Sequence, residues 1–463
     1  MLKYSFERKQ GVPLYEELYK ALKADILKGR LRAGERLPSK RAMAEDNDIS
    51  VTTVLNAYQQ LLTEGYITSR EKTGYFVSDI KKIDPIPETS RPFVGKYYKE
   101  DEWFADFQSN NFLYNHFPFA MWKKVIREIL SENDLELVRR GNPFGLEELR
   151  TQIAEFLYRS RGITVSPECV IIGAGIEYLY ARLITLFPPS TIYAVETPSY
   201  RKIPDIYQAY HLRWKSVGMD SSGVSMPDLI TSDASIVHVS PEHHYPLGTV
   251  MSIARRHELL NWAGNDEHRY IIEDDYDCEF RYHTRVIPAL KSHDATGHVI
   301  YMNTFSKTLS PAVRISYMVL PEHLLQRYIE QTHFFTNSTS SLEQYAVARF
   351  LEKGYFERHL NRIRKQYRQA GERLISLLQE SGQIPIRSIR GGDSGTHVTV
   401  RVDTEMSDRE LQRRSAEMGI QLHCLSDFCT RPDPRYDHVM VLNFSDMDEE
   451  TQREAIRRLG EIF

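Results

Sequence analysis

The sequence predicts an α/β protein preceded by a small, mainly helical domain. From about Trp103 onward, short β-rich runs alternate with helical stretches, which is typical of a mostly parallel sheet covered by helices. The first 80 residues instead follow the order helix, helix, helix, hairpin. With 463 residues the chain is too long for one ordinary domain. We therefore expect a head at 1–80, a linker at 81–102 and a body at 103–463, which ends in a small α+β domain from about 331.

Composition places the chain among globular proteins of a reducing compartment. Hydrophobic residues make up 41% and charged residues 26%, and no apolar run is long enough to cross a bilayer. The N-terminus has no apolar signal core. The four cysteines form no CxxC pair, which argues against disulfides and structural zinc: Cys169, Cys278, Cys424 and Cys429. We expect a cytoplasmic protein without a metal or a membrane partner.

Charge is unevenly distributed along the chain. Residues 1–82 carry 15 Lys and Arg against 11 Asp and Glu, whereas the remaining residues carry 44 against 52. A basic head on an acidic body suits a protein that places only its head on nucleic acid. Ordinary charge scatter explains the same numbers equally well.

The head shows three helices and a hairpin in order. The first has one apolar stripe that ends at Gly29: Leu14, Leu18, Leu22 and Ile26. Ser39 and Ser50 are natural N-caps for the second and third helices. The third helix stops at Gly65, and its expected buried side is Val54, Ala57, Tyr58, Leu61 and Leu62. Two short strands, 66–69 and 75–77, then flank a turn at 71–74.

This order suits a helix-turn-helix unit whose third helix enters the major groove. Hydroxyls can hold phosphates, amides can read base edges, and Lys and Arg neutralise the backbone. The residues suited to DNA contact are Ser39, Lys40, Arg41, Ser50, Thr52, Thr53, Asn56, Gln59, Arg70 and Lys72. A protein-binding module with a solvated polar face is the alternative.

The amino-acid sequence of the head resembles the GntR-type winged helix-turn-helix almost throughout. The shared strings are L-x-x-G-E-R-L-P-S-x-R, S-x-T-T-V-x-x-A-Y-x-x-L, E-G-Y-I and G-Y-F-V. The resemblance implies binding to an operator in double-stranded DNA. One departure is Val51, where the family often has Arg, so an operator sequence cannot be transferred from relatives.

In the body, the predicted strands are 169–172, 192–196, 235–240, 270–274 and 299–302. Sites in such sheets lie at the carboxyl ends of the strands. Beyond them, long amphipathic helices within 342–377 precede strands at 397–402 and 439–444.

The segment Asn303 to Arg314 follows the last of those five strands and carries the chemistry. A partly desolvated Lys307 can form a Schiff base with an aldehyde. Hydroxyls at Thr304 and Ser306, together with Arg314, could hold a phosphate beside it. A surface lysine in a polar loop is the alternative.

Three further strings point to the same kind of cofactor. A glycine turn at 171–176 offers backbone N–H groups and a helix N-terminus to phosphate. YIIEDDY at 270–276 ends a strand with carboxylates, one of which can pair with a protonated pyridine nitrogen. A cation site at Glu273, Asp274 and Asp275 is the alternative there, although no other ligands are suitably spaced. ETPSY at 196–200 offers an aromatic ring for stacking.

Together these strings resemble the fold-type I aminotransferases, and specifically the bacterial MocR/GabR-type transcription regulators, from about Asp106 onward. The resemblance implies pyridoxal 5′-phosphate as cofactor and Lys307 as the lysine that binds it. It further implies Arg314 as a phosphate ligand, Asp274 at the pyridine nitrogen, Tyr276 at the ring hydroxyl and Tyr200 stacked on the ring. The phosphate cup would be formed by Ala174, Gly175 and Ile176.

Departures from ordinary aminotransferases are also present. Tyr245 replaces the Asn of the N-P-x-G string, and Arg140 stands where the family commonly has Tyr. The C-terminal strand at 439–444 lacks an Arg to grip a substrate carboxylate. Arg431 and Arg435, just before it, are the candidates for that role.

Three functions follow from these patterns. The first is a homodimeric regulator that senses a small amine or amino acid and uses at most partial transamination chemistry. The second is a regulator that senses pyridoxal 5′-phosphate itself. The third is a working aminotransferase with a DNA-binding appendage, although a complete head serves no purpose for a catalyst.

Overall fold

The computed structural model describes residues 2–4, 6, 13–80, 103–109, 116–132, 134–139, 141–284 and 286–463. The chain divides into two compact units, Met1–Glu100 and Asp101–Phe463, which are described separately. The predicted linker at 81–102 lies outside the described residues. Among the described helices, none is long and apolar enough to cross a membrane.

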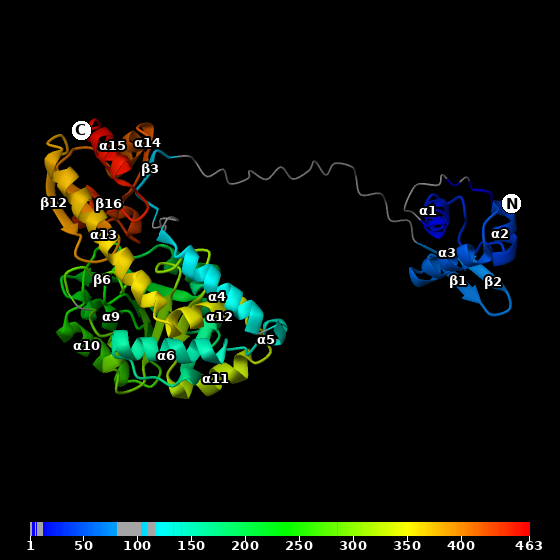
Figure 1. Cartoon of the computed structure of the whole chain (residues 1–463), viewed down its shortest axis with the longest axis horizontal. Coiled ribbons are helices and arrows are strands. Elements are labelled where there is room, and N and C mark those ends of the chain that lie inside the picture. The colour runs from blue at the N-terminus through cyan, green and yellow to red at the C-terminus, as the bar shows by residue number, and fades with distance from the viewer. Residues whose placement is uncertain are drawn as a thin grey trace. The chain divides into compact units, whose positions relative to one another are not determined.

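The first unit contains the predicted helices and hairpin (Figure 1). The elements are α1 (Leu14–Leu27), α2 (Lys40–Asn47), α3 (Val51–Thr63), β1 (Ile67–Arg70) and β2 (Gly74–Val77). Ser39 Oγ accepts a hydrogen bond from the Ala42 amide at 3.2 Å, and Ser50 Oγ accepts one from the Thr53 amide at 3.0 Å. Both predicted N-caps are therefore confirmed.

The core of this unit is the predicted apolar stripe of α1 packed against the buried side of α3. Leu18 and Leu22 are fully buried, as are Val54, Tyr58 and Leu61. Leu62 is only partly buried, because it lies beside the core cluster and not within it. β1 and β2 pair antiparallel, with Ile67 opposite Val77 and Arg70 opposite Gly74.

The second unit is built on an eight-stranded sheet with the order β4-β11-β10-β9-β8-β5-β6-β7. The strands are β4 (Val170–Gly173), β5 (Ile192–Thr197), β6 (Arg213–Asp220), β7 (Gly223–Val224), β8 (Ile236–Val239), β9 (Tyr270–Asp274), β10 (Val299–Thr304) and β11 (Ser316–Val319). β11 runs antiparallel to both its neighbours and β7 antiparallel to β6. The other strands are mutually parallel, so the predicted mostly parallel sheet is confirmed.

Helices cover both faces of this sheet, as Figure 1 shows. They are α4 (Phe119–Glu132), α5 (Asp134–Val138), α6 (Glu147–Arg161), α7 (Ile176–Ile184), α8 (Lys202–Ala209), α9 (Met226–Thr231), α10 (Ile253–Gly264), α11 (Glu322–Thr332) and α12 (Ser341–Glu352). Consecutive strand residues enter different clusters: Ile172 packs with α6 and α12, whereas Ile171 packs with α7 and α11. Two buried faces explain why the strands are continuous apolar runs.

The C-terminal part adds a second, four-stranded antiparallel sheet with the order β12-β13-β16-β15. Its strands are β12 (Ile386–Gly391), β13 (His397–Val402), β15 (His423–Cys424) and β16 (Val439–Asn443), and α14 (Asp408–Glu417) and α15 (Glu449–Gly460) accompany them. The short strands β3 (Ala105–Asp106) and β14 (Ile420–Gln421) pair beside it. The 26-residue helix α13 (Tyr355–Glu380) runs from the large sheet toward this part (Figure 1).

Candidate functional site

The predicted site residues of the body lie beyond the carboxyl ends of parallel strands. Lys307 follows β10, Asp274 ends β9, Tyr200 follows β5 and Gly175 follows β4. Because parallel strands end at one edge of a sheet, these four residues come to the same edge. The sheet order therefore brings together residues that are up to 132 positions apart in the sequence.

A glycine turn with an arginine lying against it forms a cradle where β4 turns into α7. Gly175 has a φ of 101°, and a Cβ atom added there would lie 2.3 Å from Nη2 of Arg314. The Arg314 guanidinium thus lies against bare backbone at the N-terminus of α7, where helix amides favour anions. Arg314 also pairs with Glu177 at 3.1 Å, and Glu177 pairs with Lys202. No pattern in the sequence pointed to Glu177 or Lys202.

Lys307 is held by a hydroxyl-bonded loop. Thr304 Oγ1 accepts hydrogen bonds from the Ser306 amide at 3.1 Å and from Ser316 Oγ at 2.8 Å. Burial, the largest cause, and the nearby Lys202 both lower the pKa of Lys307 and Asp277 opposes them, so that the pKa is about 8. A lysine in this state has an appreciable neutral fraction near neutral pH, as a nucleophilic amine requires.

The three consecutive carboxylates of β9 and its end go to different partners. Glu273 accepts hydrogen bonds from the amides of Leu290 and Lys291, and Asp275 pairs with Arg161 at 2.8 Å. Since they do not converge, the alternative of a shared cation site has no geometric support. Among the described residues, no group of three His, Cys, Asp or Glu could hold a metal ion.

Asp274 is supported from behind by a histidine. His238 Nε2 lies 3.5 Å from Asp274 Oδ2 and 2.7 Å from the Tyr180 hydroxyl. Both His238 and Tyr180 are buried, so the carboxylate is fixed in place by a polar pair inside an apolar cluster. His238 lies inside β8 in an otherwise apolar run, which was the only sequence signal for it.

Tyr276 lies next to a second buried histidine. Its hydroxyl donates a hydrogen bond to the His243 carbonyl at 3.2 Å, and His243 Nδ1 lies 2.8 Å from Asp277 Oδ2. Burial raises the pKa of Tyr276, and Asp277 raises it further, so the phenol stays protonated. The His243–Asp277 pair was not predicted, since the two residues are far apart in sequence.

Tyr200 is half-exposed and meets Tyr245 edge to face, with ring centroids 6.0 Å apart. Tyr245, which replaces the aminotransferase Asn, also packs against Phe428 at 5.3 Å. Burial raises the pKa of Tyr245 to about 12. This position is therefore part of an aromatic cluster that a small amide could not form.

The two candidate arginines for a carboxylate differ in their surroundings. Arg435 is exposed and pairs with Asp433 at 2.7 Å. Arg431 is exposed too, but the residue before it, Thr430, donates its amide to Thr197 Oγ1 at 3.2 Å. That contact places the Arg431 segment beside the loop that carries Tyr200. Arg140 lies outside the described residues.

All ten candidate DNA-contacting residues of the head are exposed or partly exposed. Asn56 and Gln59 lie on the open side of α3, opposite the buried Val54 and Tyr58. Val51, at the first position of α3, is 46% exposed. The third helix is therefore free to present its N-terminal half to a groove, as the sequence predicts.

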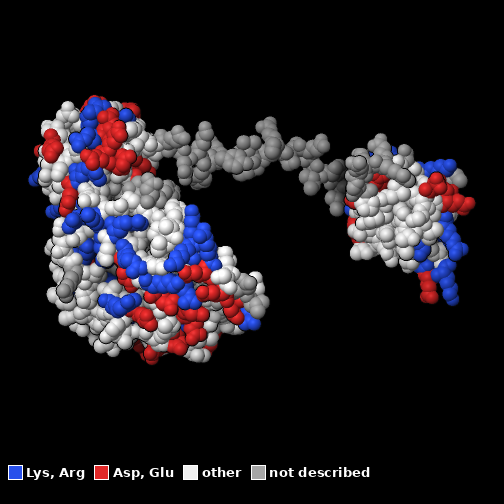
Figure 2. All heavy atoms as spheres, in the orientation of Figure 1, with Lys and Arg blue, Asp and Glu red and all other residues white. Residues whose placement is uncertain are grey.

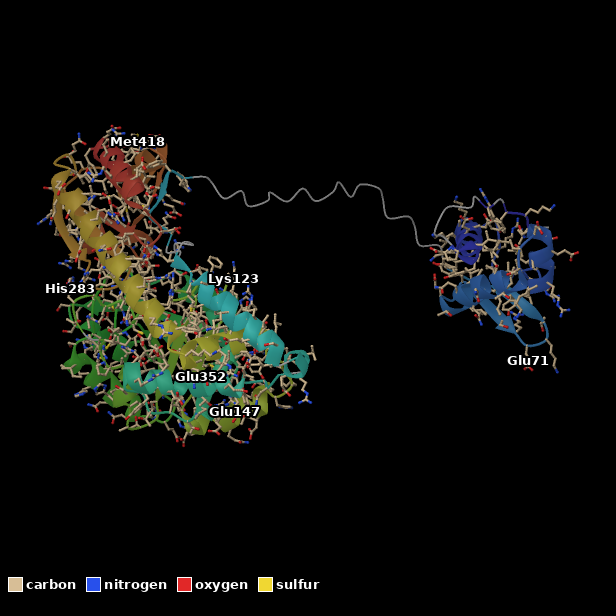
Figure 3. All side chains as sticks on the ribbon, viewed as in Figure 1. Glu71, Lys123, Glu147, His283, Glu352 and Met418 are labelled. Atoms are coloured by element: carbon tan, nitrogen blue, oxygen red, sulfur yellow. The ribbon has the colours of Figure 1, made fainter. Side chains whose placement is uncertain are left out.

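The hairpin carries basic side chains beside the acidic Glu71 at its tip, as Figures 2 and 3 show. Arg70 stacks on the ring of Phe76, with its guanidinium 4.6 Å from the ring centroid. Arg36, which sequence reasoning missed, forms a backbone bridge to Phe76. Its place in the L-x-x-G-E-R-L-P-S string was the available signal.

Comparison with known proteins agrees with both units. Residues 14–77 match the model of bacterial regulatory proteins of the gntR family, and residues 104–459 match aminotransferase class I and II. The uncharacterized HTH-type transcriptional regulator YdeL of Bacillus subtilis is 36% identical over 98% of this chain and 97% of its own length. The probable rhizopine catabolism regulatory protein MocR of Rhizobium meliloti is 30% identical over 99% and 95%.

Among solved structures, the kynurenine aminotransferase of Pyrococcus horikoshii matches with a TM-score of 0.69. It is 23% identical, and the match covers 78% of this chain and 91% of that one. This likeness shows the fold of the body.

The chain is therefore a transcription regulator that joins a helix-turn-helix DNA-binding domain to an aminotransferase-like domain. It belongs to the MocR-type regulators with a gntR-family head. The predicted fold and regulator class are confirmed. The family assignment also supports the predicted cofactor, pyridoxal 5′-phosphate, and the bare cradle at Gly175 and Arg314 fits its phosphate.

Proposed function

We propose that this regulator uses its aminotransferase-like body as a sensor, whose cofactor state alters how the head engages an operator. The observation that carries the proposal is the meeting of Lys307, Asp274 and the Arg314–Gly175 cradle at one sheet edge. The ligand is a small amine or amino acid, with pyridoxal 5′-phosphate itself as the second possibility. A ligand of either kind must bind two conformations unequally to shift the protein between them.

The cofactor would be held by groups of known placement. Arg314 and the backbone of Ala174, Gly175 and Ile176 would take the phosphate, with Ser306 as a further donor. Thr304 contributes by fixing the loop, because its hydroxyl is already bonded within it. Asp274 would lie at the pyridine nitrogen, Tyr276 at the ring hydroxyl and Tyr200 over the ring.

When bound, the cofactor supplies an aldehyde that reacts reversibly with amines. Lys307 is suited to bind that aldehyde and to be displaced by another amine, because burial keeps its amine partly neutral. Asp274, which His238 fixes in place, would stabilise a proton on the ring nitrogen. The protonated Tyr276, whose hydroxyl donates a hydrogen bond to the His243 carbonyl, would lie beside the ring hydroxyl.

The site is less well equipped for turnover than for binding. Tyr245 replaces an amide at the ring hydroxyl, and β16 carries no Arg to grip a carboxylate. A lost charged contact typically costs ~1.5–3 kcal/mol, or roughly one to two orders of magnitude. We propose spectral change without multiple turnover. Steady transamination of common keto acids at ~1 per second or faster would favour the working enzyme instead.

Arg431 is our first choice for the carboxylate of an amino-acid ligand, and Arg435 the second. Arg431 lies next to the Tyr200 loop, whereas Arg435 is already paired with Asp433. We further propose a cytoplasmic homodimer, because readers of this type place two heads on paired half-sites.

Footprinting of the DNA upstream of the protein's own gene tests the proposed function. The footprint should change when pyridoxal 5′-phosphate is added, and change again with an amine that alters the cofactor spectrum. A footprint that is the same under all conditions would contradict a sensing body. A response to the cofactor alone would favour cofactor sensing.

A further inference from the structure

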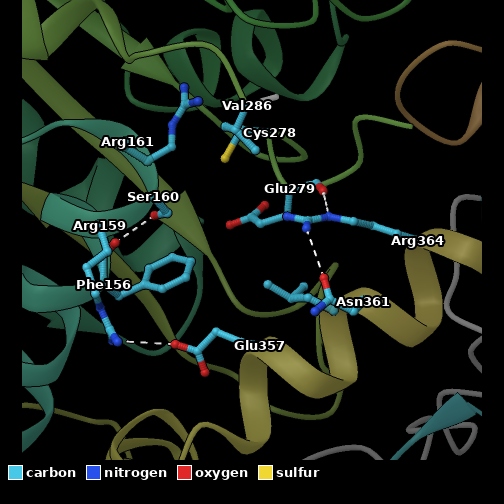
Figure 4. A pocket seen from close by; sticks show the side chains of 11 residues that line it. Phe156, Arg159, Ser160, Arg161, Cys278, Glu279, Val286, Glu357, Asn361 and Arg364 are labelled. Carbon is cyan, nitrogen blue, oxygen red and sulfur yellow. Dashed lines mark hydrogen bonds and ion pairs between the residues drawn. The ribbon is translucent and has the colours of Figure 1, made fainter. Parts of the chain in front are cut away.

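A cavity of about 460 Å³ lies between α6, α13 and the segment that follows β9 (Figure 4). Its lining is Phe156, Arg159, Ser160, Arg161, Cys278, Glu279, Val286, Glu357, Leu360, Asn361 and Arg364. None of the proposed cofactor ligands is among these residues. The cavity is therefore a separate feature of the body.

Glu279 is the most deeply buried carboxylate of the lining. The residue is only 5% exposed. Within the described part of the chain, its Oε2 atom has no hydrogen-bond partner. Figure 4 shows its carboxylate pointing into the middle of the cavity. Burial, the largest cause, and Asp275 both raise the pKa of Glu279 and Arg161 opposes them, so that the pKa is about 7. A buried carboxylate in this state is strongly stabilised by an incoming cation.

The other charges of the lining are mostly paired. Arg161 binds Asp275 at 2.8 Å, and Arg159 lies 3.4 Å from Glu357. Arg364 differs, because it donates only to neutral acceptors: the Glu279 carbonyl and, at 3.3 Å, Asn361 Oδ1. Over the described residues it has no acidic partner within ion-pair distance. Within the described residues, the carboxylate of Glu279 and the guanidinium of Arg364 thus form no ion pair, although Arg161 acts on Glu279 electrostatically.

We propose that this cavity is a second ligand site, which takes a small zwitterion of the α-amino acid class. The ammonium group would bind the Glu279 carboxylate and the ligand carboxylate would bind Arg364. The Nε atom of Arg364 donates a hydrogen bond to the Glu279 carbonyl, so the two charged side chains line the same cavity from adjoining positions. The apolar side chains of Phe156 and Leu360 would receive the ligand's side chain.

The site is placed to affect the cofactor site. Glu279 lies five residues after Asp274 along one segment, and α13 runs on from the cavity toward the smaller sheet. A ligand that fixes this segment would favour one position of the carboxylates at the end of β9.

Calorimetric titration of the full chain tests the site. The cofactor is first fixed to the protein with borohydride, so that amines cannot react there. Glycine, L-alanine and L-leucine are the probes, with ethylamine and propionate as halves of the zwitterion. We expect at least one amino acid to saturate one site per chain, and both halves to bind more than about tenfold more weakly. Absence of saturable binding by all three amino acids would overturn the proposal.

Substitutions of the two charged residues, with a matched control, test whether the amino acid binds in this cavity. Glu279→Gln and Arg364→Gln should each weaken the amino acid more than about tenfold, because each removes one charged contact. Glu372→Gln is the control, since Glu372 lies on α13 outside the lining and faces Arg368. Unchanged affinity in both Glu279→Gln and Arg364→Gln would overturn the site. If Glu279→Gln does not fold, the affinity of Arg364→Gln alone tests the site.

Discussion

The guanidinium of Arg314 lies directly against Gly175, so that a Cβ atom at position 175 would stand 2.3 Å from Arg314 Nη2. Gly175 also has a φ of 101°, which side chains rarely adopt. Position 175 is therefore restricted to glycine by its backbone, and a side chain there would also displace the end of Arg314. The same contact places the guanidinium of Arg314, which pairs with Glu177, at the N-terminus of α7, where helix amides favour a phosphate.

Gly175→Ala should lower the affinity for pyridoxal 5′-phosphate by about tenfold to a hundredfold, because Arg314 must move and its charged contact is lost. Gly162→Ala is the matched control. Gly162 also has a positive φ, of 69°, but its added Cβ would meet nothing closer than 3.7 Å. Equilibrium titration of cofactor absorbance measures both variants. Equal losses in the two would show that backbone strain, and not the cradle, is responsible.

Lys307 should be the single point of covalent attachment. Borohydride treatment of the yellow protein should fix the cofactor to the peptide that contains Lys307, and Lys307→Ala should abolish that label. Lys202→Ala should retain it, although Lys202 is close enough to influence the pKa of Lys307. Peptide mapping by mass spectrometry gives the answer, and a label on any other lysine refutes the assignment.

The rate of cofactor attachment to cofactor-free protein should depend on pH through Lys307. Since burial lowers the pKa of this amine to about 8, its neutral fraction rises roughly tenfold per pH unit below that value and levels off above it. Removing the like charge in Lys202→Met should move the midpoint upward. Removing the opposite charge in Asp277→Asn should move it downward. Stopped-flow absorbance across pH 6 to 10 measures the midpoints, and an unshifted midpoint near 10.5 would be inconsistent with a buried amine.

In the head, substitution of a phosphate-contacting residue and substitution of a base-reading residue should have different effects on DNA binding. Arg41→Ala should weaken binding to all DNA sequences and reduce the salt slope by about one, because it removes one phosphate contact. Asn56→Ala should instead change base preference, at ~1–3 kcal/mol per contact. Lys20→Ala, on α1 and paired with Glu16, is the charge control. Competition binding with randomised DNA distinguishes them; a uniform loss for Asn56→Ala would remove it from the base-reading set.

Local sequence patterns were sufficient to predict the helices and strands and the residues that follow the strands. Ser39 and Ser50 could be placed as caps because capping depends on neighbours within three residues. Lys307 and Asp274 could be placed because a parallel sheet collects strand ends at one edge.

Contacts between distant segments were beyond the reach of those patterns. His238 behind Asp274, Glu177 beneath Arg314 and Asp277 against His243 each depend on strand order, which local periodicity does not specify. The same holds for the cavity at Glu279, whose walls come from α6, α13 and the segment after β9.

In this regulator, the state of the cofactor in the body is proposed to control the affinity of the head for operator DNA. The most direct test of this control is the operator affinity of the full chain with pyridoxal 5′-phosphate, titrated with an amine that changes the cofactor spectrum, in the native protein and in Lys307→Ala. We predict that the amine shifts operator affinity several-fold in the native protein and leaves Lys307→Ala unchanged. The same shift in both proteins, or equal affinity of the native protein for operator and random DNA, would contradict the claim.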